Sequence, residues 1–321
     1  MKRLAGLFLT IGFLIAGLGS AYAAKGQIVY IVDTMGDPFW GYVALGIKDE
    51  VQQRGYGLAI SDSKSSAQNQ LQNAQDAVAK HVAGIVLSPT DSSTAPAVLD
   101  IAASANIPVS FAGIGTVSGK YVTYVTSDDE QGAHGAGVEL VKALKARGWN
   151  DGGVGMIQIS QARQNGRLRT AGFEKAMKEG GYTVVAKNEM RLYTADETFK
   201  FAQDMLTANP QMRGIFVEAA NASLGALRAI QASRRADQTL LVAFDGLPQF
   251  VDLIKQGDLV AAAMQQPYLM GFKAAESVID SIEGKPTQQT IALPVLIVTK
   301  NNMDQMLPEL EKTVFPKGSI K

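Results

Sequence analysis

Residues 27–32, Q-I-V-Y-I-V, and residues 33–41, D-T-M-G-D-P-F-W-G, form the most informative stretch of the chain. The first segment is an apolar run typical of a buried strand, and residues 42–54 show the periodicity of a helix. The nine residues between them therefore form a strand-to-helix loop, at the end of the strand where open α/β sheets bind ligands. Because Phe39 and Trp40 are costly to expose on a solvated loop, we expect this loop to form one wall of a ligand cleft.

Strand-like and helix-like segments alternate along most of the chain. We predict strands at residues 27–32, 57–61, 84–87, 107–111, 121–126, 153–159, 183–186, 214–217, 239–244 and 260–264, and intervening helices that include 42–54, 65–80, 94–104, 198–208, 224–232 and 248–256. Continuous apolar strands separated by helices indicate a parallel sheet that is covered on both faces. The pattern starts again near residue 153, so we predict an α/β fold with two doubly wound parallel-sheet lobes and a cleft between them.

The end of the chain supplies elements that either lobe could adopt. Residues 268–283 are predicted to form a further helix and residues 295–299 a further strand. If this segment crosses back over the cleft, the lobes are joined by a multi-strand hinge near Ser127-Asp128, Gln265–Pro267 and Leu293. We therefore expect an N-terminal lobe of residues 25–127 plus 266–292. The C-terminal lobe would comprise residues 128–265 plus 293–321.

The N-terminus has the features of an export signal. Lys2 and Arg3 precede an apolar run over residues 4–18 and a small-residue segment over residues 20–24. This pattern predicts a signal peptide of residues 1–23, cleaved after Ala23, with an uncleaved membrane anchor as the alternative. The chain has no cysteine, which excludes disulfides, thiolate chemistry and a lipoprotein anchor. We expect a periplasmic protein in a Gram-negative-type cell.

Composition and motifs argue against several other functions. The 321-residue chain has 30 basic and 30 acidic residues, so it lacks the basic excess needed to bind nucleic acid. The two histidines lie in no recognisable nucleophile or metal motif. Residues 115–120, G-T-V-S-G-K, are one residue short of a P-loop, and no dinucleotide fingerprint follows the first strand. We therefore predict no catalytic residue, no metal site and no cofactor.

Polar and aromatic residues recur where the predicted strands end. Aromatic faces can stack on a sugar-like ring, and carboxylates, amides and guanidinium groups can hydrogen-bond its hydroxyls. Loops are polar in any case, so each residue is weak evidence by itself and the combined pattern carries the prediction. Arg167 and Arg169 are two residues apart and point in different directions, so one could face the ligand while the other forms an ion pair. The candidate ligand-binding residues are Asp37, Phe39, Trp40, Asn165, Arg167, Tyr193, Asn221, Asp245 and Gln265.

Several motifs make the mature chain similar to a known family. They are D-P-F-W at 37–40, S-P-T-D-S at 88–92, R-L-R-T-A-G-F at 167–173, L-G-A-L at 224–227, F-D-G at 244–246 and Q-Q-P at 265–267. The chain resembles periplasmic sugar-binding proteins of the ribose-binding type, which are ABC-importer subunits with the type I periplasmic binding protein fold. The resemblance implies a polar contact from Asp37, stacking from Phe39 and Trp40, and ligand contacts from Arg167, Tyr193, Asp245 and Gln265. It also implies a membrane permease as partner and a monomeric receptor.

Two departures from the family pattern bear on the ligand. Gly113-Ile114 stands where the family often has Asp-Arg, and Ala219-Ala220 stands where it has Asn-Asp, which leaves Asn221 nearby. A hydroxyl without a partner in a desolvated cleft is disfavoured, so we expect a smaller, less hydroxylated or differently charged ligand than ribose. Residues 260–302 also resemble the trimethylamine-N-oxide sensing protein. The alternative function is therefore a periplasmic ligand sensor that signals to a membrane histidine kinase, and a periplasmic enzyme is a third possibility.

Overall fold

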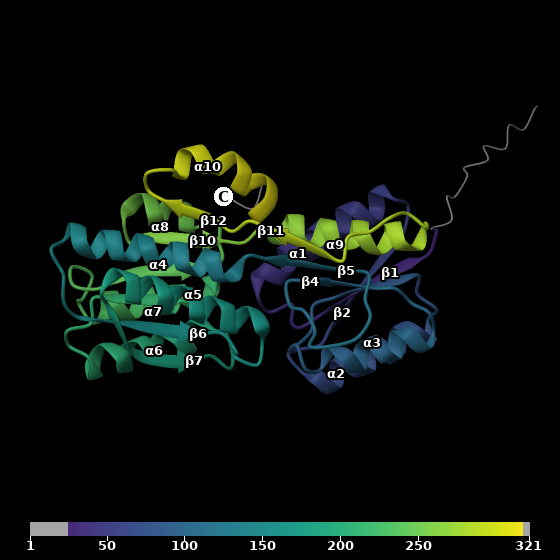
Figure 1. Ribbon diagram of the computed structural model, residues 1–321, viewed down its shortest axis with the longest axis horizontal. Coiled ribbons are helices and arrows are strands. Elements are labelled where there is room, and N and C mark those ends of the chain that lie inside the picture. The colour runs from purple at the N-terminus through teal and green to yellow at the C-terminus, as the bar shows by residue number, and fades with distance from the viewer. Residues whose placement is uncertain (1–24, 317–321) are drawn as a thin grey trace, which may run out of the picture.

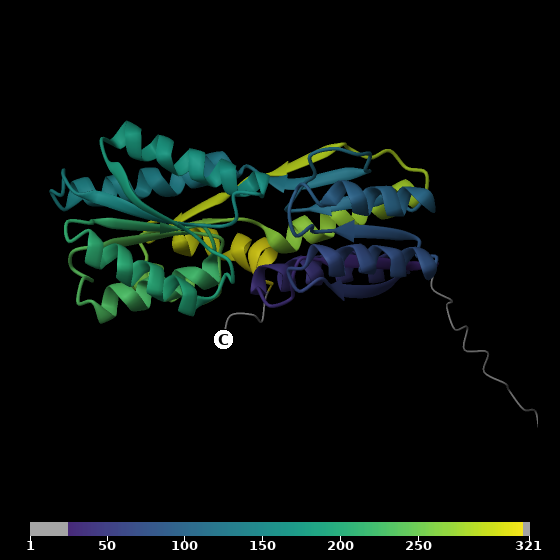
Figure 2. The same cartoon turned by 90° about the horizontal axis from the view of Figure 1, so that it is seen from below.

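The computed structural model describes residues 25–316, which form two lobes joined end to end along the long axis of the molecule (Figures 1 and 2). Each lobe is built on a six-stranded sheet with helices on both faces. All strand pairs are parallel except the pair at one edge of the second sheet. The predicted α/β fold of two doubly wound lobes is confirmed. The predicted signal peptide and its cleavage site lie outside the described residues.

The sheet of the N-terminal lobe has the strand order β11-β5-β4-β3-β1-β2. Its strands are β1 (Gln27–Val32), β2 (Gly57–Asp62), β3 (Gly84–Leu87), β4 (Val109–Ala112), β5 (Thr123–Ser127) and β11 (Thr290–Leu293), and its helices are α1 (Pro38–Gln53), α2 (Ala67–Ala79), α3 (Ala95–Ser104) and α9 (Pro267–Ile282). In β1, Tyr30 packs with α1 and α9 on one face of the sheet, while Ile31 packs with α2 and α3 on the other. Burial on both faces explains why this strand is an unbroken apolar run.

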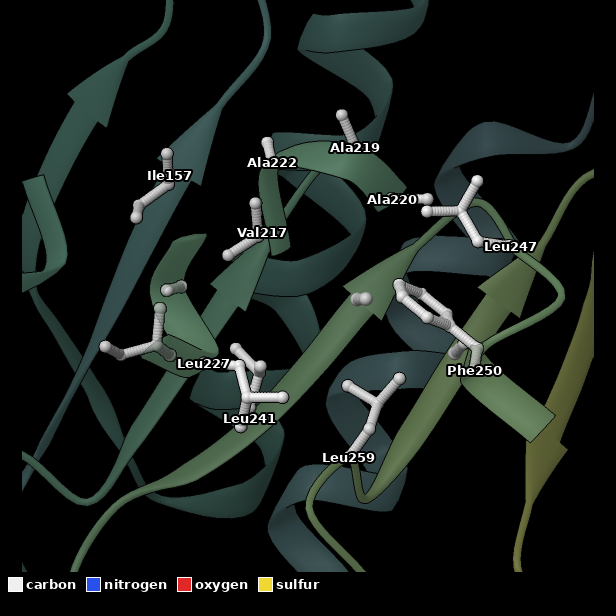
Figure 3. Packing of buried hydrophobic residues seen from close by; sticks show 14 of the residues in the cluster. Ile157, Val217, Ala219, Ala220, Ala222, Leu227, Leu241, Leu247, Phe250 and Leu259 are labelled. Carbon is white, nitrogen blue, oxygen red and sulfur yellow. The ribbon is translucent and has the colours of Figure 1, made fainter. Parts of the chain in front are cut away.

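The sheet of the C-terminal lobe has the order β12-β10-β9-β8-β6-β7, in which only β12 runs antiparallel to its neighbour. Its strands are β6 (Gly153–Gln158), β7 (Thr183–Glu189), β8 (Gly214–Val217), β9 (Leu240–Phe244), β10 (Ala261–Met264) and β12 (Leu296–Thr299), and its helices are α4 (Asp129–Ala146), α5 (Gln164–Gly180), α6 (Ala195–Ala208), α7 (Ala220–Ala232), α8 (Phe250–Gln256) and α10 (Met303–Glu309), followed by a π-helical turn (Leu310–Val314). Figure 3 shows the core on one face, where Val217 and Leu241 from the strands pack near Phe250.

Three short segments carry the chain between the lobes. They connect β5 to α4, β10 to α9, and β11 to β12. Two of these segments are hydrogen-bonded to each other, because the Gln266 side chain donates to the carbonyl oxygen of Pro294 over 2.8 Å. The Asp128 N–H donates to the carbonyl oxygen of Leu293 over 3.2 Å, which ties the third segment to the same group.

Glycine allows α1 and α9 to pack closely against each other in the N-terminal lobe. A Cβ atom at Gly46 would collide with the backbone carbonyl of Tyr268, and one at Gly271 would collide with that of Val43. Because these neighbours are backbone atoms, they cannot move aside as a flexible side chain would. The contact fixes α1, whose first turn carries Phe39 and Trp40.

The predicted elements differ from the structure mainly where they meet the interlobe cleft. Strands β1, β3 and β8 have the predicted bounds, whereas α1 and α7 each begin four residues earlier than predicted. Phe39 and Trp40 therefore lie in the first turn of a helix and not on a loop. Strand β11 and helix α10 were not predicted.

Candidate functional site

A cavity lies between the lobes, at the carboxyl ends of strands from both sheets. Small-molecule sites usually occupy clefts of this kind between domains. The residues that line it are Asp37, Phe39, Trp40 and Gly113 from the N-terminal lobe, and Ile159, Arg163, Asn165, Arg169, Tyr193, Ala219, Asp245 and Gln265 from the C-terminal lobe and its crossing segment.

Seven of the nine residues predicted to bind ligand line this cavity: Asp37, Phe39, Trp40, Asn165, Tyr193, Asp245 and Gln265. Asn221 lies in the wall of a second chamber that adjoins the cavity. Arg167 lies in neither place. Its side chain is exposed and donates through Nη1 to the carbonyl oxygen of Gln161 over 2.7 Å. The implied ligand contact of Arg167 therefore does not fit this structure, in which Arg163 and Arg169 line the cavity instead.

The first turn of α1 places the two aromatic rings in the cavity. Asp37 is the N-cap of α1, and its Oδ1 accepts the Phe39 N–H over 3.1 Å. Pro38 suits the first helical position because no intrahelical hydrogen bond requires its missing N–H. The Phe39 and Trp40 rings are arranged edge to face, with centroids 4.9 Å apart. The helix thereby holds both rings in fixed positions against a ligand.

Helix geometry explains why Arg169, and not Arg167, faces inward. Phe173 is fully buried in the core of the C-terminal lobe, and a residue four positions earlier lies on the same face of a helix. Arg169 has that spacing, whereas Arg167 is six residues from Phe173. The spacing to Phe173 is a signal in the sequence that could have identified the inward-facing arginine.

Arg169 holds together three elements beneath the cavity. Its Nε donates to Asp129 Oδ1 over 2.8 Å, and its Nη1 donates to the carbonyl oxygen of Glu218 over 2.7 Å. Nη1 also lies 3.5 Å from Asp245 Oδ2. The guanidinium carbon lies 4.0 Å from the centroid of the Phe244 ring. Burial raises the pKa of Asp129 to about 6 and also raises that of Asp245, and Arg169 partly opposes both shifts.

Glu218 is a fully buried carboxyl group below the same wall. Its Oε2 accepts the Ile159 N–H and its Oε1 accepts the Thr170 hydroxyl, both over 2.9 Å. Burial raises the pKa of Glu218 to about 8, and Arg169 and the hydrogen bonds partly oppose that shift. The side chain therefore holds the backbone at Ile159 in place while remaining largely neutral at pH 7.

Arg163 connects the two lobes across the cleft. Its Nη2 donates to Asp33 Oδ2 over 2.7 Å, and its Nε donates to the carbonyl oxygen of Thr90 over 3.0 Å. The two charged side chains are 9% and 2% exposed, so this ion pair is shielded from water. The Arg163 guanidinium carbon also lies 5.1 Å from the centroid of the Tyr193 ring. Because these contacts join both lobes, the structure represents a form in which the lobes touch.

Carboxyl groups outnumber guanidinium groups in and around the cavity wall. Arg163 is paired with Asp33, and Arg169 is shared between Asp129 and Asp245, which leaves Asp37 as a further carboxyl group in the lining. Burial raises the pKa of Asp37 to about 6, so the group is mainly ionised at pH 7. This charge distribution favours a ligand that donates hydrogen bonds, and it disfavours an anionic one.

The cavity also contains an unused hydrogen-bond acceptor. Asn165 is 8% exposed, and its buried Oδ1 has no hydrogen-bond partner. Leaving such an atom unpaired costs about 1–3 kcal/mol. A ligand hydroxyl could supply the missing donor. By contrast, Gln265 uses its amide to donate to Asp245 Oδ1 over 2.6 Å, which fixes that carboxylate in the wall.

Two doubly wound lobes with an aromatic and carboxylate-lined cavity between their strand ends define a receptor for a small polar solute. The chain belongs to the periplasmic binding protein domain family, whose model matches residues 28–286. This family assignment confirms the resemblance inferred from the sequence.

The chain is similar to import binding proteins for sugars. It is 28% identical to the ribose import binding protein RbsB of Escherichia coli over 300 residues, which cover 94% of this chain and 99% of that protein. It is 25% identical to the D-apiose import binding protein of Actinobacillus succinogenes over 247 residues, which cover 77% and 78%.

A solved structure agrees with these relatives. The carbohydrate transporter solute binding protein of Agrobacterium radiobacter, in complex with D-arabinose, superposes with a TM-score of 0.83 at 25% identity. The match covers 91% of this chain and 99% of that one. These proteins are substrate-binding components of transporters, which confirms the expectation that the chain is not an enzyme. The comparisons give the kinase-sensor alternative no support.

Within residues 25–316, no helix combines the length and apolar character needed to cross a bilayer. The same residues contain no cluster of three or more histidine or acidic side chains arranged to hold a metal ion.

Proposed function

We propose that this protein is the periplasmic solute-binding subunit of an ABC importer for a sugar or sugar-like ligand. The ligand binds in the interlobe cavity, contacts both lobes and stabilises the closed form. The closed receptor then delivers the ligand to a membrane permease. The export signal at residues 1–23 would direct the chain to the periplasm, where it would act as a monomer.

The observation that supports this proposal most strongly is the composition of the cavity wall. Phe39 and Trp40 can stack on the C–H face of a ring, while Asp37, Asp245 and Asn165 can accept hydrogen bonds from its hydroxyls. These groups come from both lobes, so a ligand that contacts them all binds the closed form more tightly than the open one. That difference in affinity would drive closure.

The chemistry of the wall also restricts the ligand. Gly113 and Ala219 contribute no polar side chain, and a Cβ atom at Gly113 would lie 3.3 Å from the Trp40 ring. Asp37 and Asp245 would repel a carboxylate or phosphate. We therefore propose a neutral or cationic sugar or sugar-like ligand, and not a sugar acid or sugar phosphate.

A thermal-shift screen tests the proposal. The mature chain would be screened against neutral sugars, polyols, amino sugars, sugar acids and small amines, and hits would be titrated calorimetrically. A ligand present at 100 times its dissociation constant should add about 2.7 kcal/mol of stability. Saturable binding of a neutral or amino sugar supports the proposal. Binding restricted to sugar acids, or to none of these compounds, contradicts it.

A further inference from the structure

A second chamber adjoins the cavity within the interlobe cleft. It is larger than the inner cavity. Four residues line both spaces: Asp37, Trp40, Arg163 and Tyr193. Because the two chambers share these lining residues, they adjoin, and one ligand could extend from the inner cavity into the outer chamber.

The outer chamber is present even though the lobes are in contact. Its walls come from both lobes, with Thr34 and Ser65 on one side and Thr194 and Asn221 on the other. The Asp33–Arg163 ion pair, which joins the lobes over 2.7 Å, is itself part of its lining. The space is therefore not a consequence of separated lobes. A single ring in the inner cavity would leave it unfilled.

A buried acceptor without a partner lies in the outer chamber. Asp33 is 1% exposed, and its Oδ2 accepts the hydrogen bond from Arg163. Its Oδ1 is also buried and has no hydrogen-bond partner. Burial raises the pKa of Asp33, and the nearby Arg163 and Ser65 side chains partly oppose that shift. Asn165 Oδ1 is the corresponding unpaired acceptor in the inner cavity. Each chamber thus has one buried oxygen that a ligand hydroxyl could satisfy.

The loop between the chambers is held rigidly. Tyr193 has a φ of 56°, a conformation that is uncommon for a bulky residue. The Glu197 carboxylate accepts the N–H groups of Arg191, Leu192 and Tyr193 over 2.9, 2.9 and 3.1 Å, which stabilises this conformation. The Tyr193 hydroxyl accepts the Ser160 N–H over 3.1 Å. The aromatic ring is therefore fixed at the boundary, where it can contact a ligand in both chambers.

The lining of the outer chamber matches a hydroxylated group. Thr34, Ser65 and Thr194 have hydroxyls, and Asn221 has an amide. The Asn221 side chain makes no hydrogen bond to the described residues, so its amide is available. The rim also includes Leu192, which is 71% exposed and could cover the edge of a ring.

We propose that the outer chamber is a second sugar subsite and that the ligand is a disaccharide or a glycoside with a polar second group. One ring occupies the inner cavity between the aromatic residues and the carboxylates. The second group lies against Asp33, Tyr193 and Asn221. This inference rests on the proposed sugar-binding function and specifies the size of the ligand.

The test is calorimetric titration of the mature protein with disaccharides and glycosides, each compared with its constituent monosaccharides. The measured quantity is the ratio of the two affinities. We expect the best extended ligand to bind about tenfold tighter than its best constituent, or more tightly still, which corresponds to about 1.4 kcal/mol. Asn221→Trp should reduce this ratio to one or below because the indole fills the chamber, and Asn221→Ala should reduce it less. Asn301→Ala, at an exposed asparagine outside both chambers, is the matched control and should keep the wild-type ratio.

The outcomes separate the two proposals. If monosaccharides bind and no extended ligand binds more tightly, the second subsite is wrong and the sugar-binding function stands. The same conclusion holds if an extended ligand binds tightly but Asn221→Trp does not change the ratio. If neither class binds, the proposed function fails, and the second subsite fails with it.

Discussion

Replacing Glu218 by glutamine should change the pH dependence of stability in a defined direction. The wild-type carboxyl has its pKa raised from 4.5 to about 8 by burial. A raised pKa in the folded state means that its favourable contribution is fully present below pH 4.5 and is lost as pH rises through about 8. Glutamine keeps an oxygen for the Ile159 N–H and an amide for the Thr170 hydroxyl, and it cannot ionise.

The size of the effect follows from the change in pKa. The difference between about 8 and 4.5 is about 3.5 pH units, which at about 1.36 kcal/mol per unit gives an upper value of about 5 kcal/mol. Glu218→Gln should therefore match wild type near pH 4.5 and become more stable as pH rises, with the difference reaching its maximum above pH 8.

The assay is urea unfolding of both proteins from pH 4.5 to 9, with the difference in free energy of unfolding plotted against pH. Titrating groups that both proteins share and that do not interact with Glu218, such as Asp37, largely cancel in this difference. A constant difference across the range would refute the assignment of a raised pKa to Glu218. So would a variant that loses stability relative to wild type as pH rises.

Three further substitutions test the site and the packing that holds it. Trp40→Ala should weaken sugar binding, measured by calorimetry, by about 10–100-fold because ring stacking is lost. Circular dichroism should show that the variant remains folded. Unchanged affinity would mean that this ring does not contact the ligand. Asp33→Asn should weaken the charge-assisted hydrogen bond to Arg163 by about 1.5–3 kcal/mol. Ligand affinity should fall, and the radius of gyration of the ligand-free protein, measured by X-ray scattering, should increase. An unaltered radius and affinity would show that this pair does not hold the lobes together. Gly46→Ala should lower the melting temperature by several degrees because its methyl group meets the backbone of α9, whereas Gly41→Ala in the same helix has open space and should not; equal melting temperatures would contradict the packing of these two helices.

The fold could be predicted from the sequence because its central strands are buried on both faces. Residues 27–32 and 214–217 are short apolar runs bounded by helix-period segments, and both form strands with the predicted bounds. Strand β11, T-I-A-L, was missed because it is an edge strand of only four residues with two exposed side chains. Pro294 separates it from the apolar residues of β12. The position of β11 depends on pairing with β5 across a separation of more than 160 residues.

The sequence could predict those residues of the candidate site that directly follow a strand. Asp245 and Gln265 directly follow strands whose carboxyl ends meet at the cleft, so their position follows from topology. Arg163 could not be found in this way, because its partners Asp33 and Thr90 belong to the other lobe and come together only when the lobes touch. The structure places Arg169, and not the predicted Arg167, at the cavity, and the reason is local: Arg169 has the helical spacing to Phe173 on α5.

The most direct test of the central claim is a calorimetric titration of the mature wild-type protein and Trp40→Ala with the best saccharide from the screen. The account predicts saturable one-to-one binding to wild type and a loss of affinity of at least about tenfold in the variant. Failure of every neutral or amino sugar to bind wild type, or equal affinity in the two proteins, would contradict a sugar receptor built around this interlobe cavity.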